Sequence, residues 1–317
     1  MKITRKDKQI WEELSIDQGL SRWSKIFEES ANEILFLSPN WIKTYIDDPN
    51  IKMIIISKGG LDIAAMLIET NGNNIFKMKL GGPLIKKNIQ ELKPCKVLSY
   101  EKAILENFAE IILKRTNNYM AFWHYDIKYW YPMKWKGFNQ TTRYHFITKI
   151  KDKKKCWDNL ETKIRTDIRK AAKNKLNIKE ENIDDFLSLY KKTNPRNFKE
   201  IYKFYKTLST NLKCEIRTTY LKKEALSSIF FIEFKDTIYY IDSYKNSNKK
   251  FYGSQSFNIW NLIENSNATY FNFLGSSIPA VEKYFRGFGG DPKPHSVIYI
   301  NNIYFRLLFK IKKIFSN

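Results

Sequence analysis

The residues that could do chemistry lie mainly in the second half of the chain, where apolar segments end in polar ones. Asp242 and Tyr244 close the apolar segment 237–244 ("TIYYIDSY"), which is typical of a strand. A carboxylate at the end of such a strand could accept a proton from an attacking amine, and the phenol of Tyr244 is a second polar candidate. The competing interpretation is that Asp242 caps backbone N–H groups at a turn.

A basic loop follows this strand and leads into a segment that is typical of a helix. Four residues of the loop are candidates for binding a phosphate group: Lys249, Lys250, Gly253 and Ser254. Free backbone N–H groups and the helix dipole favour an anion at a helix N-terminus, so we expect the pyrophosphate of a co-substrate there. A solvated surface turn is the competing interpretation.

The segment 270–290 ("YFNFLGSSIPAVEKYFRGFGG") begins as a buried strand and ends in a glycine-rich turn. Gly275 and Ser276 are small residues that could end the strand and let a substrate approach the backbone closely. Arg286 could face a phosphate or the oxyanion that develops on an acyl group. Alternatively, Arg286 lies on a C-terminal hairpin, where its aliphatic stem covers apolar surface.

A second group of cations follows a helical spacing. Arg165 and Arg169 are four residues apart and share a helix face with Lys173. Two guanidinium groups on one face could clamp the diphosphate of an acceptor. A solvated basic face is the alternative.

The elements that must position these residues occur twice in the chain. Each copy combines a hairpin of two apolar runs, a helix and a short closing strand. The first copy comprises residues 61–70, 75–82, 99–115 and 119–125, and the second comprises residues 225–234, 237–244, 253–266 and 270–276. We therefore predict an α/β fold of two tandem domains, each a mixed, mostly antiparallel sheet flanked by helices. The domains are expected at residues 1–148 and 149–302, followed by a basic amphipathic tail at residues 303–317.

Further elements are predicted between the two copies. Residues 141–150 are expected to form a strand that crosses between the domains, and residues 156–176 a single amphipathic helix. The segment 182–184 ("NID") is expected to cap a helix that includes residues 185–193, and another helix is expected at residues 198–210.

The chain has 317 residues and a formal net charge of +22, from 55 Lys and Arg against 33 Asp and Glu. This charge favours anionic partners such as phosphates, nucleic acid or an anionic membrane face.

The three cysteines have no paired spacing and the three histidines are far apart in the sequence, so we predict neither a disulfide framework nor a metal site. The N-terminal residues lack the apolar core of a signal peptide, and no stretch approaches the ~20 apolar residues of a membrane span, so a cytoplasmic protein is expected.

Residues 303–317 ("IYFRLLFKIKKIFSN") contain no acidic residue. As a helix, this tail places its apolar residues on one side and Arg306, Lys310 and Lys313 on the other. Such a helix could lie in the anionic interface of the inner membrane, or it could dock on the protein with its cations outward.

The order of strand, phosphate-binding loop, helix and strand in the second half resembles the core of the GNAT acyltransferases. That family's loop signature is Gln/Arg-x-x-Gly-x-Gly/Ala. Residues 250–255 ("KFYGSQ") keep a leading cation and the central glycine, whereas Gln255 stands in place of the final small residue. A tandem pair of such domains is similar to the Fem-type peptidoglycan aminoacyltransferases and their FemAB-like and BioF2-like relatives. The basic helix 164–176 and the segment 271–290 carry this resemblance, which covers residues 20–300.

The resemblance implies an N-acyltransferase without a permanently bound cofactor, with acyl-CoA or aminoacyl-tRNA as co-substrate. It implies an acceptor amine on an anionic cell-envelope precursor, either an amino sugar or a peptidoglycan stem peptide, carried on a sugar diphosphate or a lipid. It also implies that Phe285 and Arg286 lie at the substrate, although relatives commonly have Lys at the second position. The long coiled-coil arm with which Fem enzymes help to hold tRNA is not expected, because residues 178–218 are predicted to hold only short helices.

Two alternatives to an enzyme stay open. Aromatic residues interleaved with Lys in residues 129–146 ("YWYPMKWKGFNQTTRYHF") could stack on single-stranded RNA, and the same segment is also typical of a core strand. A degenerate pair of GNAT domains that acts only as a scaffold is the other alternative. No motif combines a nucleophile with its own base, so an enzyme built on this chain is expected to transfer the group directly, without a covalent intermediate.

Overall fold

The computed structural model describes residues 9–30, 33–69, 81–87, 93–115, 119–193, 198–246 and 253–300. The chain divides into two compact units, of which the first contains residues 1–143 and 295–317 and the second residues 144–294. Two strands run through these boundaries, β6 (Asn139–Lys149) and β12 (Asp291–Tyr299). Residues 295–302 therefore fall in the first unit, whereas the sequence had suggested one domain over 149–302.

The first unit is built on a four-stranded antiparallel sheet in the order β1-β2-β3-β4. Its elements are β1 (Gln9–Leu14), α1 (Ile16–Glu28), η1 (Leu35–Leu37), α2 (Pro39–Ile42), η2 (Lys43–Tyr45), β2 (Ile51–Lys58), β3 (Leu61–Glu69), β4 (Leu84–Ile85), α3 (Pro94–Arg115), β5 (Met120–Phe122) and α4 (Tyr131–Trp135). Neighbouring residues of a strand face opposite sides, so Met53 contacts Gly19 of α1 while Ile54 joins the core around Phe108 of α3. The two helices therefore lie on opposite faces of the sheet.

The hairpin that the described residues form in the first unit joins β2 and β3. The predicted pairing of residues 61–70 with 75–82 stays a prediction, because most of the second segment is not described. Lys58 pairs with Leu61, and the two residues between them, Gly59 and Gly60, have φ angles of 58° and 76°. Two positive φ angles make the two-residue turn that best fits the twist of a hairpin. Residues 70–80 lie outside the described residues.

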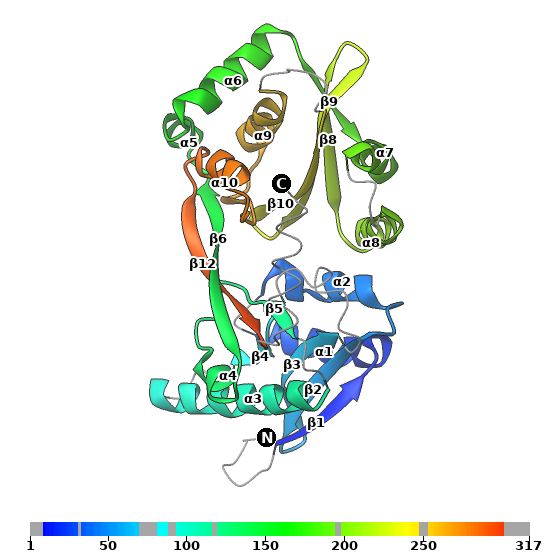
Figure 1. The fold of residues 1–317 in the computed structure, drawn as a ribbon, viewed down its shortest axis with the longest axis vertical. Coiled ribbons are helices and arrows are strands. Elements are labelled where there is room, and N and C mark those ends of the chain that lie inside the picture. Colours follow the sequence, from blue (N-terminus) through cyan, green and yellow to red (C-terminus); the bar gives the residue numbers. More distant parts are fainter. Residues whose placement is uncertain are drawn as a thin grey trace. The chain divides into compact units, whose positions relative to one another are not determined.

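The second unit contributes most of an eight-stranded sheet in the order β5-β12-β6-β11-β10-β9-β8-β7. Its remaining elements are α5 (Lys153–Asp158), α6 (Thr162–Lys173), β7 (Asn177–Glu181), α7 (Ile183–Thr193), α8 (Phe198–Asn211), β8 (Cys214–Leu221), β9 (Glu224–Phe234), β10 (Thr237–Lys245), α9 (Ser254–Asn265), β11 (Tyr270–Asn272) and α10 (Pro279–Arg286). On β9, Phe230 packs on Phe186 of α7, while the next residue, Phe231, shares a core with Ile259 of α9. Helices therefore cover both faces of the sheet in this unit (Figure 1).

Several predicted elements of the second unit are confirmed. The hairpin over residues 225–244 is β9 and β10, the expected helix is α9, and the closing strand is β11. Asn182 Oδ1 accepts the N–H groups of Asp184 and Asp185 at 2.8 and 3.1 Å, and so caps the start of α7. In residues 178–218, α7 has 11 residues and α8 has 14, and no long helical arm occurs among the described residues of this segment.

The single helix predicted over residues 156–176 is wrong, because the segment forms two helices. Asp152 caps α5 by accepting the Lys155 N–H group at 2.9 Å. At the break that follows, the Glu161 N–H group donates to the Gly287 carbonyl at 2.8 Å, so a contact with a distant segment replaces the next turn of helix. The predicted crossing strand over 141–150 is β6, but the segment 129–146 begins as the short helix α4 rather than as a strand.

Among the described residues, no helix combines the length and the apolar content needed to cross a bilayer. The tail at residues 303–317 lies outside the described residues.

The chain turns sharply where β11 ends. Leu274 and Gly275 have φ angles of 59° and 79°, in the left-handed region. A Cβ atom on Gly275 would overlap the carbonyl oxygen of Tyr144 in β6. Gly275 therefore allows two backbones to pass each other at a distance that no other residue permits.

We expect Gly275→Ala to lower the free energy of unfolding by about 3 kcal/mol, because a left-handed backbone strains alanine and the methyl group overlaps a carbonyl. Gly60→Ala is the matched control, since Gly60 has a φ of 76° but nothing within 4 Å of the added Cβ. This variant should lose only about 1 kcal/mol. Urea unfolding measures the free energy of unfolding of both variants. Equal losses would show that the close approach to Tyr144 adds nothing to the cost of the Gly275→Ala substitution.

Candidate active site

The two strands that carry the candidate site run parallel for only a short distance. β10 and β11 pair over Thr237–Tyr239 and Tyr270–Asn272. β11 then ends, whereas β10 continues to Lys245 and stays paired with β9 on its other edge. From Tyr240 onward, the edge of β10 that faced β11 no longer has β11 as its partner.

A β-bulge in this part of β10 directs its side chains to different layers. Tyr240 pairs with Phe231 and Asp242 pairs with Phe230, which leaves Ile241 as the extra residue. Because Phe231 and Phe230 face opposite layers, Tyr240 points towards α9 and α10 while Asp242 points towards α7 and α8. Without the extra residue, Tyr240 and Asp242 would face the same layer.

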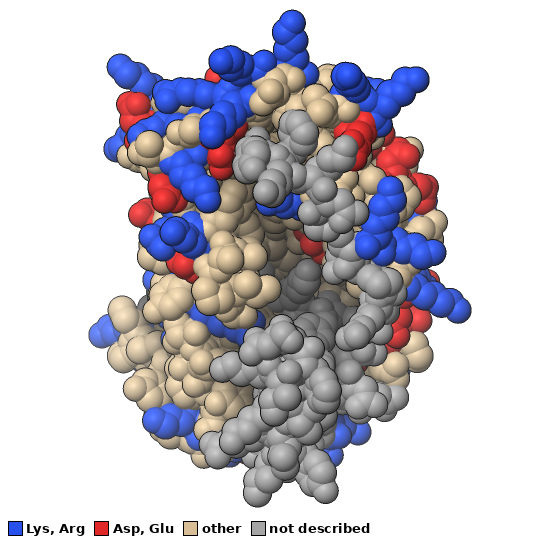
Figure 2. Space-filling model, turned by 45° about the horizontal axis from the view of Figure 1, so that its top comes forward, with Lys and Arg blue, Asp and Glu red and all other residues tan. Residues whose placement is uncertain are grey.

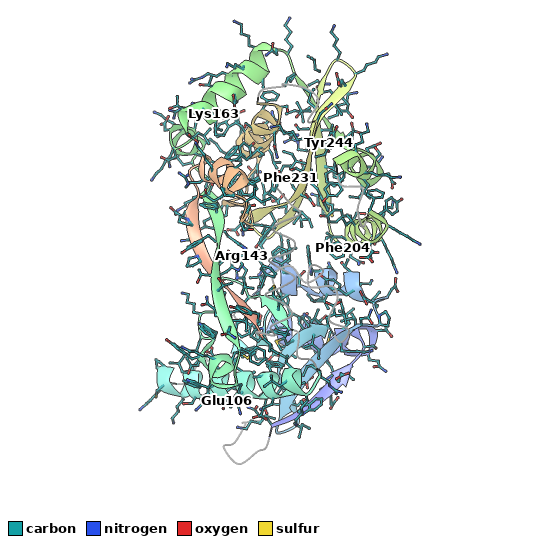
Figure 3. All side chains as sticks on the ribbon, in the orientation of Figure 1. Glu106, Arg143, Lys163, Phe204, Phe231 and Tyr244 are labelled. Carbon is teal, nitrogen blue, oxygen red and sulfur yellow. The ribbon has the colours of Figure 1, made fainter. Side chains whose placement is uncertain are left out.

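Asp242 lies half-buried between two tyrosines of the helical layer. The hydroxyl of Tyr205 on α8 donates to Asp242 Oδ2 at 2.6 Å, and Tyr190 on α7 also bonds the carboxylate. Burial first, and then the charge of Asp242, raise the pKa of Tyr205 well above its usual value, so its hydroxyl stays protonated as a donor. Tyr244 follows on the same strand and is buried, and burial raises its pKa (Figure 3).

The N-terminus of α9 approaches the opened part of β10 from the other layer. Gly253 has a φ of 85°, and a Cβ atom there would overlap the backbone of Asp167 on α6. Ser254 is buried, and its carbonyl accepts from the Thr219 hydroxyl at 3.3 Å. The first N–H groups of a helix have no partners within it, so Gly253 and Ser254 stand at a position suited to an anion. Lys249 and Lys250 lie outside the described residues.

Gln255 joins the helix to the strand. Its side-chain amide donates to the Tyr240 hydroxyl at 2.5 Å and to the Ser243 hydroxyl at 3.2 Å. The residue that replaces the small one of the GNAT loop signature therefore turns inward and holds α9 against β10. The sequence analysis identified Gln255 as a departure from the loop signature, but nothing in the sequence indicated that its side chain points towards β10.

Asn272 is a site residue that the sequence analysis missed. It lies at the last pair before the strands part and is 0% exposed. Its Oδ1 accepts the Leu274 N–H group at 2.9 Å, but its Nδ2 has no hydrogen-bond partner. A buried donor without an acceptor costs free energy unless a ligand satisfies it. An asparagine inside the aromatic run "YFNF" was the signal that could have identified it.

The residues predicted around the glycine-rich turn already have contacts within the second unit. Phe285 is 5% exposed and lies 5.5 Å from the ring of Tyr240 and 5.1 Å from that of Phe273. The side chain of Arg286 is 60% exposed and pairs with Glu282, four residues earlier on α10, at 3.1 Å. Ser276 Oγ accepts the Ile278 N–H group at 3.1 Å, just before α10 begins.

The two candidate clamp arginines are already engaged within their own segment. Arg165 donates to the Asp158 carbonyl at 2.8 Å and to the Thr162 hydroxyl at 3.3 Å. The guanidinium of Arg169 lies 5.4 Å from the ring centroid of Trp157. Lys and Arg side chains gather on the surface in the upper part of Figure 2. An anionic acceptor would have to compete with these contacts for Arg165.

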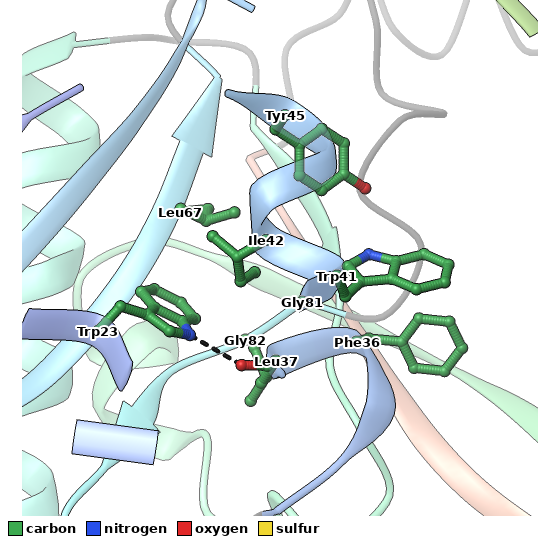
Figure 4. A pocket seen from close by; sticks show the side chains of 9 residues that line it. All are labelled: Trp23, Phe36, Leu37, Trp41, Ile42, Tyr45, Leu67, Gly81 and Gly82. Atoms are coloured by element: carbon green, nitrogen blue, oxygen red, sulfur yellow. Dashed lines mark hydrogen bonds between the residues drawn. The ribbon is translucent and has the colours of Figure 1, made fainter. Parts of the chain in front are cut away.

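A small hollow in the first unit is too small for a substrate. It is lined by nine residues: Trp23, Phe36, Leu37, Trp41, Ile42, Tyr45, Leu67, Gly81 and Gly82 (Figure 4). Its cavity volume of about 10 Å³ holds one water molecule at most. Trp23 donates its indole N–H group to the Leu37 carbonyl at 2.8 Å, so the polar atom of this wall is satisfied. Within the described ranges, no group of three or more His, Cys, Asp or Glu side chains is arranged to hold a metal ion.

We expect Tyr205→Phe to lower the free energy of unfolding by about 2 kcal/mol, because a partly buried carboxylate loses a charge-assisted bond. Tyr202→Phe is the matched control, since it removes a bond of 3.1 Å to the exposed carboxylate of Asp184 on the same pair of helices. That bond competes with water, so its loss should cost less than about 0.5 kcal/mol. Chemical denaturation measures the free energy of unfolding of both variants. If Tyr205→Phe is as stable as Tyr202→Phe, the bond from Tyr205 to Asp242 does not hold the carboxylate as described.

No protein-family model matches the chain, and no curated protein matches it in sequence. Solved structures do match over almost the whole chain. FemX has a TM-score of 0.60 at 12% identity, over 94% of this chain and 99% of its own. A tandem GNAT protein from the clavulanic acid biosynthesis pathway has a TM-score of 0.58 at 7% identity, over 92% and 98%. An acetyltransferase of the GNAT family from Colwellia psychrerythraea has a TM-score of 0.56 at 9% identity, over 94% and 100%. The chain therefore has a Fem-like tandem GNAT fold.

Proposed function

We propose that this protein is an N-acyltransferase that moves an acyl or aminoacyl group to an amine of a cell-envelope precursor. The observation that carries the proposal is the parting of β10 from β11 next to the N-terminus of α9. This arrangement offers open strand backbone to a thioester or ester and free helix N–H groups to the phosphates of the same donor. Its fold, which is similar to that of FemX, supports the same reaction class.

The donor binds at the N-terminus of α9 in this proposal. Gly253 and Ser254 supply backbone N–H groups, and Lys249 and Lys250 supply positive charge. Acyl-CoA and aminoacyl-tRNA are the two candidate co-substrates, since both place a phosphate-rich carrier beside a reactive carbonyl. Neither requires a permanently bound cofactor.

In the reaction, the amine nitrogen attacks the carbonyl carbon of the donor. The C–N bond forms, the C–S or C–O bond breaks, and the carrier leaves as a thiol or hydroxyl. Asp242 takes a proton from the amine, directly or through water, while the hydroxyl of Tyr205 holds the carboxylate in place. Tyr244 is a further polar group on the same strand. Arg286 and the unpaired Nδ2 of Asn272 stabilise the developing oxyanion.

Direct transfer fits the cysteines of the second unit. Burial raises the pKa of Cys156 to about 11 and that of Cys214 to about 12. Both groups are therefore thiols at neutral pH, and a thiol is a far weaker nucleophile than a thiolate. These two residues are poor candidates for an acyl-enzyme intermediate.

We assign the acceptor to amino sugars and peptidoglycan stem peptides that carry phosphate. Arg165 and Arg169 clamp the diphosphate, and the backbone at Gly275 and Ser276 lies close to the chain that bears the amine. We place the protein in the cytoplasm, with residues 303–317 at the inner face of the membrane when the acceptor is attached to a lipid. tRNA is a partner only if the donor is aminoacyl-tRNA.

Binding of single-stranded RNA is a second candidate function, favoured by one surface of the first unit. The rings of Trp130 and Tyr131 stack at 5.8 Å with an interplanar angle of 9°, and Trp135 is 58% exposed. Lys102 lies 5.2 Å from the ring of Trp135 and Lys134 lies 5.8 Å from that of Tyr131. Exposed rings flanked by cations can stack on bases and bind phosphates.

Thermal-shift binding separates these functions. The probes are acetyl-CoA, free CoA, an aminoacyl-tRNA mixture, uncharged tRNA, nucleotide sugars and a single-stranded RNA homopolymer. Stabilisation by CoA species, or by aminoacyl-tRNA but not by uncharged tRNA, supports the transferase and names its donor. Stabilisation by the homopolymer alone, lost steeply with salt, supports the RNA-binding function instead.

With the donor known, we expect Asp242→Asn to lower kcat about 100-fold, because amide oxygen is a far weaker base than carboxylate. Asp184→Asn on α7 is the matched control, since this exposed carboxylate also accepts a tyrosine hydroxyl. Mass spectrometry of acylated amino sugars and stem peptides gives the rates. A kcat of Asp242→Asn within twofold of the control would exclude Asp242 as the base.

A further inference from the structure

Three polar residues of the first unit converge on one face of its strands, and none of them belongs to the proposed transfer site. Arg143 lies on β6, labelled in Figure 3. His295 lies on β12, and His124 follows β5 by two residues. The strand register determines how the side chains of these three residues lie relative to one another.

The strand register brings the two histidines opposite each other. β5 and β12 pair with Phe122 opposite Val297, and the Trp123 N–H group extends this pairing by donating to the Ser296 carbonyl at 2.8 Å. The next residues in register are His124 and His295. Side chains alternate along a strand, so both histidines share the face of Phe122.

Arg143 reaches the same face. Its guanidinium carbon lies 5.0 Å from the centroid of the Phe122 ring, and the His295 ring lies 6.3 Å from that ring. The phenyl ring therefore holds the guanidinium beside the histidines.

The charge of Arg143 has no counter-ion in the described part of the chain. Arg143 is half-buried and forms neither a hydrogen bond nor an ion pair with any described residue. Burial lowers its pKa, which is the cost of holding a cation in a partly desolvated place. Burial and the nearby positive charge lower the pKa of His295 to about 4, so His295 is neutral at pH 7. A bound anion would compensate Arg143.

His124 presents a second unsatisfied group at this place. It is 1% exposed, and its Nε2 has no hydrogen-bond partner. On the opposite edge of the ring, Nδ1 lies 3.3 Å from both the N–H group and the Oδ2 atom of Asp126. When Nδ1 accepts the Asp126 N–H group, the neutral ring carries its proton on Nε2. This tautomer can donate from Nε2 to an anion.

We propose that Arg143 and His124 bind a carboxylate group in the first unit, with His295 beside it. The single positive charge of Arg143 matches a single negative charge. A phosphate dianion would keep excess charge, and the carboxylate of Asp126 would repel it. The carboxylate can belong to a small acid or to the end of a peptide. The proposal does not depend on the transfer reaction.

The chain contains three histidines, which makes a site-specific binding measurement practical. Protein labelled with ¹⁵N-histidine is titrated with acetate, N-acetylglycine, N-acetylglycinamide and inorganic phosphate at constant ionic strength. His→Gln variants assign the imidazole resonances. We expect saturable shifts at His124 with acetate and N-acetylglycine, and none with the uncharged amide. Tighter binding of N-acetylglycine assigns the site to a peptide end, and equal binding to a small acid.

Arg143→Gln should raise the Kd for acetate at least about tenfold, because a charge-assisted contact is lost. The matched control is Lys114→Gln, which removes an exposed cation on α3 of the same unit and should leave the Kd unchanged. Arg143→Gln should also raise the unfolding temperature of the free protein by about 2 °C, because it removes an uncompensated charge. Non-saturable shifts, tighter binding of phosphate than of acetate, or equal Kd values in the two variants would overturn the proposal.

Discussion

The short parallel pairing of β10 and β11 is the constraint on which the second unit depends. The pairing ends because Leu274 and Gly275 adopt left-handed backbone and carry the chain past the carbonyl of Tyr144. A longer β11 would occupy the edge of β10 with its own hydrogen bonds and close the sheet. Because β11 stops early, no described strand pairs with the edge of β10 beside Tyr240, and the proposed reaction needs such an edge.

A single extra residue in β10 gives this edge two different environments. Tyr240, on one side of the bulge, joins a core of aromatic rings that includes Phe273 and Phe285. Asp242, on the other side, meets Tyr205 at 2.6 Å. The Tyr240–Phe285 pair is edge-to-face, and such pairs contribute about 0.5–1.5 kcal/mol beyond the area they bury. Ring packing thus stabilises one side of the strand, while a tyrosine hydroxyl orients the carboxylate on the other side.

The cations of this protein differ in how their charge is compensated within the chain. Arg286 pairs with Glu282, and Arg165 bonds a carbonyl of its own segment. Exposed contacts of this type are weak and a ligand can displace them. Arg143 is different, because it is half-buried and has no partner among the described residues. The net charge of +22 gave no indication of which cation would be left unpaired.

Local patterns in the sequence determined the elements whose stabilising contacts are local. The hairpin of β9 and β10, the helix α9 and the Asn182 cap of α7 depend on alternation, helical spacing and a side chain three residues away, so they could be predicted. The repeated layout of hairpin, helix and closing strand likewise predicted two tandem domains. Long-range contacts decided the rest. A bond from Glu161 to Gly287 splits one predicted helix into two. Phe285 was expected at the substrate and lies in the core, while Asp242 meets a tyrosine 37 positions away. Only the tertiary structure could decide these positions, because one bulged residue reverses which layer a side chain faces and no local pattern records it.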